Sequence, residues 1–275
     1  MSEKTTPVIA AKNSIKLFLE KFDIAITSYS NLQKLYEHSH KLSGNIQAGY
    51  DIEFLSKLPA DKMIPSFKNL TKSKSQIRQD LFVLSELNFK RNGFFVEFGA
   101  TNGIGVSNTH LLEKEFGWIG ILAEPAKCWH SDLRKNRNCS IETRCIWSSS
   151  DATLIFNEVA NADLSTIENF SSNDDHREAR KKGKTYEVKT ISLLDLLDNF
   201  SAPKQIDYLS IDTEGSEFEI LSHFDFDKYQ FKVITCEHNF TPMREKLYKL
   251  LTSKGYVRKF DDVSQFDDWY VKAVS

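Results

Sequence analysis

The sequence predicts an α/β fold with a largely parallel sheet, preceded by a helical extension. From about Ser73 onward, short apolar runs alternate with amphipathic segments, as expected where strands alternate with helices. Before that point, large apolar residues recur every three or four positions from Ile15 to Tyr36, which places one stripe along a helix. We therefore divide the chain into an N-terminal helical extension with its connector, residues 1–72, and an α/β domain, residues 73–275.

Composition excludes several classes of protein. The 275 residues are 40% apolar and 27% charged, as in globular proteins. Lys and Arg number 36 against 38 Asp and Glu, so no basic field attracts nucleic acid. No apolar run reaches the ~18 residues of a membrane span, and no signal peptide is evident, so we expect a cytoplasmic protein. We expect reduced thiols at the four cysteines, which show no metal-ligand spacing: Cys128, Cys139, Cys145 and Cys236.

The helical stripe has two interpretations. It packs within its own chain, or it pairs with the same helix of a second subunit as a short coiled coil and makes a homo-oligomer. Residues 43–74 then mix Gly and Pro with short apolar groups, which indicates connecting structure without a long element.

Seven strands are expected in the α/β domain. They are 94–98, 119–123, a stretch ending at 145–147, 207–211, 232–236, and a final pair around 256–260 and 269–273. One helix is expected to run from a cap at 107–109 to about Phe116, and another from Pro242 to Gly255. In open sheets of this kind, ligands bind outside the carboxyl ends of the strands.

The first strand runs into a glycine loop, VEFGATNGIG (96–105). Gly99 and Gly103 permit a tight turn and close approach of a ligand to the backbone. The spacing is not GxGxxG, which weakens a dinucleotide interpretation. Glu97 can receive a cationic amine, and Asn102 and Asn108 offer amides to a carboxylate or a ribose. The alternative is a plain turn.

Two further positions indicate an adenosine-containing ligand. Glu124 ends the second strand 25 residues after Gly99, a distance at which an acid can accept hydrogen bonds from a ribose diol. The alternative is a solvated carboxylate. After the third strand, the region of Asp151 can meet an adenine amino group, with Trp147 as a stacking face or as a core residue.

Acidic and polar side chains follow the fourth and fifth strands. The fourth delivers Asp212, with Glu214 and Glu217 close behind, and the fifth delivers Glu237, followed by His238 and Asn239. Adjacent parallel strands would bring Asp212 close to that second group. Because buried acids are costly unless they are paired, a cation, a metal, water or a substrate must satisfy them. Glu214 and Glu217 can instead favour the positive end of the following helix.

These segments together resemble the FkbM family of S-adenosylmethionine-dependent methyltransferases. The resemblance is carried by 75–84, 94–103, 107–109, 117–125, 206–217, 237–239 and 267–271. It implies a Rossmann-like class I methyltransferase sheet of seven strands, the donor S-adenosylmethionine, and O-methylation of sugar or polyketide hydroxyls. Position by position, it implies donor contacts at the methionine end from Glu97, Gly99, Asn102 and Gly103, at the ribose from Glu124 and near the adenine from Asp151, with Asn108 bracing the loop.

A sugar hydroxyl is a weak acid, so the acceptor needs a general base or a Lewis acid. In one route Asp212, with Glu237 and His238 or Asn239, holds Mg²⁺ or another divalent metal. In the other, His238 takes the proton, oriented by Asp212 or Glu237. Both routes make Asp212 and His238 the catalytic pair, whereas a structural role for His238 is the alternative.

We expect an O-methyltransferase that acts on a carbohydrate hydroxyl in the biosynthesis of a surface polysaccharide or glycoconjugate. The alternatives are a polyketide, other natural product or lipid acceptor, a nucleotide-binding oxidoreductase, and a non-catalytic ligand-binding module. The basic run 171–184 is either a lid over an anionic acceptor or a solvated segment. Gln76, Gln79 and Asp80 either close over the site or form a solvated helix face.

Overall fold

The chain divides into two compact units, Met1–Thr71 and Lys72–Ser275. The structure is a computed structural model that describes residues 45–159, 165–167, 180–181 and 183–273. The first unit contains α3 (Asn45–Lys57) and α4 (Ala60–Asn69), so the expectation of connecting structure without a long element is wrong there. Buried apolar side chains such as Phe54 and Met63 outweigh the local preferences of Gly and Pro. The stripe at residues 15–36 lies outside the described residues.

A seven-stranded sheet organises the second unit, in the order β10-β11-β9-β8-β1-β2-β3. Five strands are parallel, and β11 runs antiparallel to both of its neighbours. The bounds are β1 Phe94–Phe98, β2 Ile119–Ala123, β3 Ser140–Glu142, β8 Gln205–Ile211, β9 Gln230–Glu237, β10 Tyr256–Lys259 and β11 Asp267–Lys272. The predicted α/β fold with a seven-stranded sheet is confirmed.

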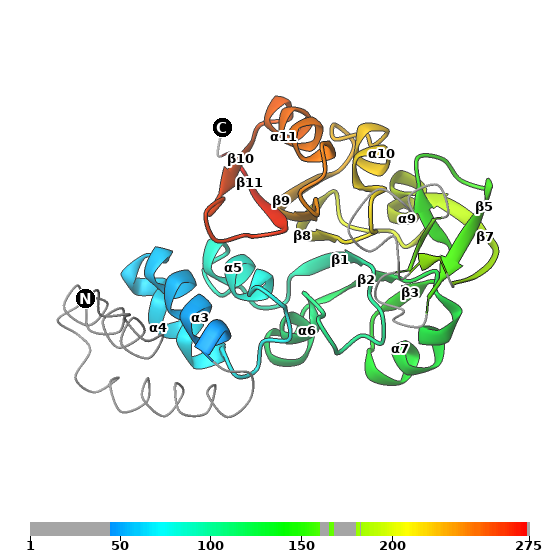
Figure 1. The fold of residues 1–275 in the computed structure, drawn as a ribbon. Coiled ribbons are helices and arrows are strands. Elements are labelled where there is room, and N and C mark those ends of the chain that lie inside the picture. The colour runs from blue at the N-terminus through cyan, green and yellow to red at the C-terminus, as the bar shows by residue number, and fades with distance from the viewer. Residues whose placement is uncertain (1–44, 160–164, 168–179, 182, 274–275) are drawn as a thin grey trace, which may run out of the picture. The chain divides into compact units, whose positions relative to one another are not determined.

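Helices cover both faces of this sheet. On one side lie α5 (Gln79–Glu86) and α6 (His110–Phe116), and on the other α10 (Glu217–Ser222) and α11 (Met243–Ser253) (Figure 1). The remaining helices are α7 (His130–Asn136), the 3₁₀ turn η1 (Lys127–Trp129) and α9 (Leu193–Asn199). Because both faces are buried, the central strands are continuous apolar runs, which is why β1 and β2 could be bounded from sequence.

A second, smaller sheet stands beside the carboxyl edge of the first. It has four strands in the order β4-β7-β5-β6, with β4 Cys145–Trp147, β5 Thr153–Glu158, β6 Thr166–Ile167 and β7 Lys184–Ser192. The third strand of the main sheet was expected in a stretch ending at 145–147, but Cys145–Trp147 pairs with β7. The strand beside β2 is instead β3, whose Ile141 pairs with Leu122.

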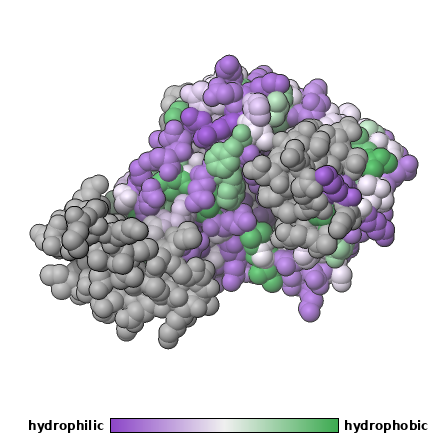
Figure 2. Space-filling view, viewed as in Figure 1, coloured by the Kyte–Doolittle hydropathy of each residue, from purple (hydrophilic) through white to green (hydrophobic). Residues whose placement is uncertain are grey.

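The surface carries scattered apolar residues. The face in view is largely hydrophilic, with apolar side chains in small separate groups (Figure 2). Among the described helices, none combines the length and apolar character that a membrane crossing requires. All four cysteines are free in the structure; Cys145 and Cys236 are buried, whereas Cys139 is half-buried and Cys128 is exposed.

Gly99 allows the backbone after β1 to lie close to the backbone after β8. Its φ is +73°, and a Cβ there would lie 2.2 Å from the backbone oxygen of Asp212. A Gly99→Ala variant should therefore lose about 3 kcal/mol or more of unfolding free energy, from left-handed strain and the clash together. Chemical denaturation measures this loss. Gly105→Ala is the matched control, because a Cβ at Gly105 would meet its nearest neighbour at an ordinary 3.6 Å. Equal stability of the two variants would contradict this role of Gly99.

Candidate active site

A cavity of about 330 Å³ opens at the carboxyl ends of the central strands of the main sheet. The ends of β1, β2, β8 and β9 contribute Gly99, Glu124, Asp212 and Glu237 to its wall. In the strand order, β1 stands between β2 and β8: β2 and β3 lie on one side of it, and β8 and β9 lie on the other. This point in the strand order is where open α/β sheets bind ligands.

Glu124 directly follows β2, and its carboxylate holds two loops in place. Its Oε2 accepts a hydrogen bond from the Thr101 amide (2.8 Å), and its Oε1 accepts one from the Ala126 amide (2.7 Å). The side chain lines the cavity. A carboxylate has about four lone-pair directions, so Glu124 can brace these loops and still accept from a ligand diol.

Glu97 was expected at the methionine end of the donor. It lines the cavity, but its carboxylate accepts hydrogen bonds from Ser107, the Asn108 amide and Thr109. The buried guanidinium of Arg137 lies 3.7 Å away. Glu97 thus fixes the loop that enters α6, and Arg137 is a residue that the sequence analysis missed, because nothing in its neighbourhood indicates burial.

The other residues of the glycine loop differ in their placement. Asn102 and Gly103 do not line the cavity: the Asn102 Oδ1 accepts the amides of Ile104 and Gly105 (2.8 Å each), and Gly103 packs on the Arg137 side chain. Asn108 does line it. Its Nδ2 donates to Ser210 (3.0 Å), while its buried Oδ1 has no partner among the described residues. That oxygen is available to a donor group on a ligand.

The end of the cavity beside Glu124 is apolar. It is lined by Pro125, Cys145, Ile146, Phe156 and Ile167. This surface, partly from the second sheet, suits a flat heteroaromatic ring. Asp151, expected near an adenine, is exposed and absent from the wall, and its amide donates to the Thr190 carbonyl (3.0 Å). The interpretation of Asp151 as an adenine contact is therefore corrected, and Trp147 also lies outside the wall.

Asp212 and Glu237 meet where β8 and β9 end. The register pairs Ile211 with Cys236, so the next residues of the two strands face each other, as predicted. One carboxyl oxygen of each residue lies within 4.8 Å of one of the other. Burial raises the pKa of Asp212 to about 7 and the pKa of Glu237 well above its usual range, and neighbouring acids add to both shifts. This pair can therefore share and exchange a proton near neutral pH.

His238 is not part of the cavity wall, which corrects its assignment as a base and as a metal ligand. Its ring is buried, with Nε2 3.8 Å from Asp268, and its Nδ1 accepts the Phe240 amide (3.0 Å). Burial lowers the pKa of His238 to about 4. His238 follows the end of β9, and its side chain is directed to Asp268 and the Phe240 amide, whereas Glu237, the last residue of the strand, lines the cavity. The structural alternative fits.

A His238→Asn variant should leave methyl transfer within about threefold of wild type, because it changes no group in the cavity. The Asn Oδ1 can accept the Phe240 amide in place of Nδ1. The rate of transfer from labelled donor, with thermal unfolding as a check of the fold, measures this. A folded variant that loses about 100-fold in rate would restore His238 as a base.

The structure places three residues that precede β1 and one residue of the basic run. Gln76 lines it, whereas Gln79 and Asp80 are buried, with Gln79 Nε2 donating to Asp267 (3.0 Å), so neither lies on a solvated helix face. Arg180, within the basic run, has a fully buried side chain that pairs with Glu214 (2.8 Å). No local signal distinguishes Arg180 from the other charges of that run.

The fold and the cavity define the class of protein. A seven-stranded sheet of this strand order, with one antiparallel strand and an acid-lined cavity at the carboxyl ends, is that of a Rossmann-like class I methyltransferase. The family model described as "Methyltransferase FkbM domain" matches residues 97–269. The chain therefore belongs to the FkbM family of S-adenosylmethionine-dependent methyltransferases, as the sequence resemblance predicts.

Similar solved structures are distant. A methyltransferase FkbM from Methylobacillus flagellatus KT has 12% identity and a TM-score of 0.44, over 82% of this chain and 59% of that chain. A precorrin-6y C5,15-methyltransferase from Geobacter metallireducens has 13% identity and a TM-score of 0.39, over 70% and 87%. This chain thus spans about three fifths of the Methylobacillus protein. Among curated proteins, no match is found.

Proposed function

We propose that this methyltransferase transfers the methyl group of S-adenosylmethionine to a hydroxyl oxygen of a carbohydrate, in the making of a surface polysaccharide or another glycoconjugate. The observation that carries the proposal is the Asp212–Glu237 pair: Asp212 is half-buried, Glu237 is buried, and both line the same cavity as Glu124. It supplies a proton acceptor in the cavity wall, at the ends of β8 and β9, whereas Glu124 follows β2.

The donor would lie across the carboxyl ends of the strands. Glu124 would accept from the ribose hydroxyls, and the unpartnered Oδ1 of Asn108 would accept from the donor's ammonium group. Gly99 leaves room for the methionine part against the backbone. The sulfonium methyl would then face Asp212 and Glu237.

The reaction is an in-line displacement. The acceptor oxygen forms a bond to the methyl carbon as the carbon–sulfur bond breaks, and that electron pair stays on sulfur to give S-adenosylhomocysteine. The hydroxyl proton passes to a carboxylate of the Asp212–Glu237 pair. Holding the oxygen in line provides most of the remaining rate enhancement, since the donor is already activated.

Neutral polar side chains support a polyhydroxylated acceptor. Four such side chains line the cavity and offer hydrogen bonds to several hydroxyl groups: Gln76, Thr213, Ser216 and Asn239.

The test is transfer of a labelled methyl group from S-adenosylmethionine to a panel of glycosides, oligosaccharides, polyketides and lipids. We expect label in a carbohydrate, in a form that resists mild alkali, as an ether does and an ester does not. If the label appears only in a polyketide or a lipid, the acceptor is that class of molecule and not a carbohydrate. Donor binding without transfer to any of the panel would favour the non-catalytic module.

A further inference from the structure

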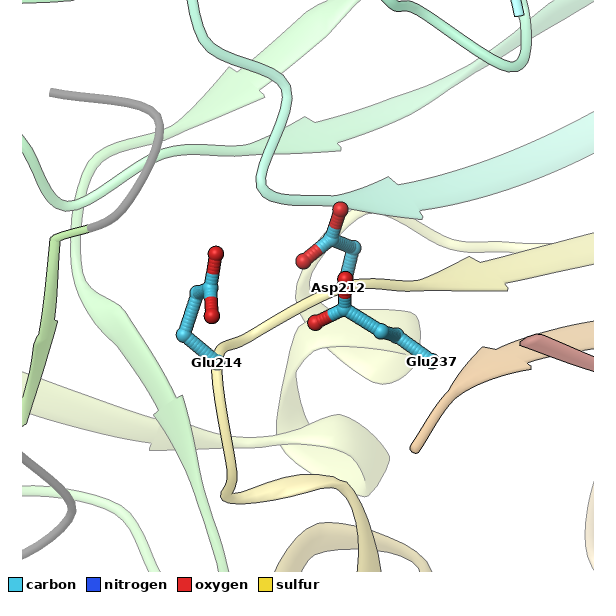
Figure 3. Close-up of side chains that lie close together, drawn as sticks. All are labelled: Asp212, Glu214 and Glu237. Carbon is cyan, nitrogen blue, oxygen red and sulfur yellow. The ribbon is translucent and has the colours of Figure 1, made fainter. Parts of the chain in front are cut away.

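Three carboxylates converge at the acidic end of the cavity. They belong to Asp212 and Glu214, which follow β8, and to Glu237, the last residue of β9. One oxygen of each lies within 4.8 Å of the other two. Figure 3 shows the three side chains directed toward a common point. Glu214 thus takes the place that the sequence analysis gave to His238.

Glu214 is held in this position from behind. Its backbone is left-handed, with φ 57°, and its carbonyl accepts from the Thr166 hydroxyl (2.9 Å). Its Oε2 accepts from Arg180 Nη2 (2.8 Å) and from Asn239 Nδ2 (3.3 Å). A non-glycine residue held in this conformation costs about 1–3 kcal/mol, so the turn that aims Glu214 at the other two acids is maintained by these contacts.

A second observation indicates that a ligand is needed here. Glu237 is 7% exposed, and its Oε2 has no hydrogen-bond partner among the described residues. A buried acceptor without a partner costs about 1–3 kcal/mol, and more if it is charged. The free oxygen belongs to a residue of the cavity wall, so something that enters the cavity can satisfy it.

Two carboxylates of the cluster have no cationic partner among the described residues of the wall. Arg180 neutralises Glu214, while Asp212 and Glu237 face each other with no Lys, Arg or His among the described residues of the wall. The pair must share a proton or bind a cation. Two carboxylates match the charge of a divalent ion, and a set of oxygen ligands without sulfur or nitrogen selects a hard cation such as Mg²⁺.

We propose that Asp212, Glu214 and Glu237 bind a divalent cation of the Mg²⁺ type. This inference rests on the proposed function for its role: a bound Mg²⁺ keeps several positions for water or substrate oxygens and acts as a Lewis acid on a coordinated hydroxyl. An acceptor with neighbouring hydroxyl groups, such as a sugar, is the class of molecule that can occupy such positions.

Calorimetry of the full chain with MgCl₂ and MnCl₂, with and without S-adenosylhomocysteine, tests the inference without any acceptor. We expect one site in the wild type, with affinity at least about tenfold lower in Asp212→Asn and in Glu237→Gln, since each removes a charged ligand. Glu142→Gln is the matched control: Glu142 is also a buried acid at a strand end, but it pairs with Arg144 (2.7 Å) outside the cavity.

The outcomes are separable from those of the proposed function. S-Adenosylhomocysteine binding by each variant shows that the site is folded. The proposed cation site is wrong if the wild type binds neither Mg²⁺ nor Mn²⁺ under either condition. It is also wrong if Asp212→Asn and Glu237→Gln bind the cation as tightly as the Glu142→Gln control does. In both cases, S-adenosylhomocysteine binding by the same samples would leave the methyltransferase assignment intact. If the wild type binds the cation and not S-adenosylhomocysteine, the donor placement fails instead.

Discussion

An Asp212→Asn variant should lose methyl transfer almost completely while it still binds the donor. The amide can neither take a proton nor serve as a charged ligand. In the proposed arrangement Asp212 contacts the acceptor rather than the ribose, which is assigned to Glu124 on another strand. Contributions of this kind amount to ~10²- to 10⁴-fold in rate, so transfer of labelled methyl should fall by about that factor. The affinity for S-adenosylhomocysteine should change by less than about threefold.

Sinefungin makes the same test without an acceptor, because it carries an ammonium group where the donor carries its methyl group. Wild-type protein should bind it more tightly than S-adenosylhomocysteine, and Asp212→Asn should reduce that preference about tenfold, the size of a lost charged hydrogen bond. Asp151→Asn is the control, since Asp151 is exposed and lies outside the cavity wall. An unchanged preference in Asp212→Asn would place the methyl group elsewhere.

A Glu124→Gln variant should lose about tenfold to one-hundredfold in affinity for S-adenosylhomocysteine, as expected for charged hydrogen bonds to a diol. The change also disturbs one of the two amide contacts to Thr101 and Ala126, so affinity alone does not separate the two roles. The 2′-deoxy analogue of S-adenosylhomocysteine separates them. If Glu124 binds the ribose, the variant and the wild type should differ much less for the analogue; an equal loss for both ligands would make Glu124 only a loop brace.

The main sheet could be predicted where its strands are buried on both faces. β1 and β2 match the predicted ranges to the residue, because parallel central strands are continuous apolar runs between polar turns. The edge strand β3 could not be recognised, since only Ile141 of its three residues is apolar. The strands of the second sheet mix polar and apolar residues, and its order links segments far apart in the sequence.

The acidic pair could be predicted from topology alone. Asp212 and Glu237 follow neighbouring parallel strands, so their proximity needs only the correct strand order and register. His238 is adjacent to Glu237 in the sequence but follows the end of β9, and its contacts with Asp268 and the Phe240 amide come from the local turn and from packing, which the sequence pattern does not show. Glu214 enters the site through a left-handed turn, and Arg180 through long-range packing, and neither is visible in local sequence.

A crystal structure of the full chain with S-adenosylhomocysteine tests the central claim most directly. We predict the ribose hydroxyls on Glu124, the adenine against Ile146 and Phe156, and the sulfur directed toward Asp212 and Glu237. A ligand bound outside this cavity, or a sulfur atom facing away from those two carboxyl groups, would contradict the account.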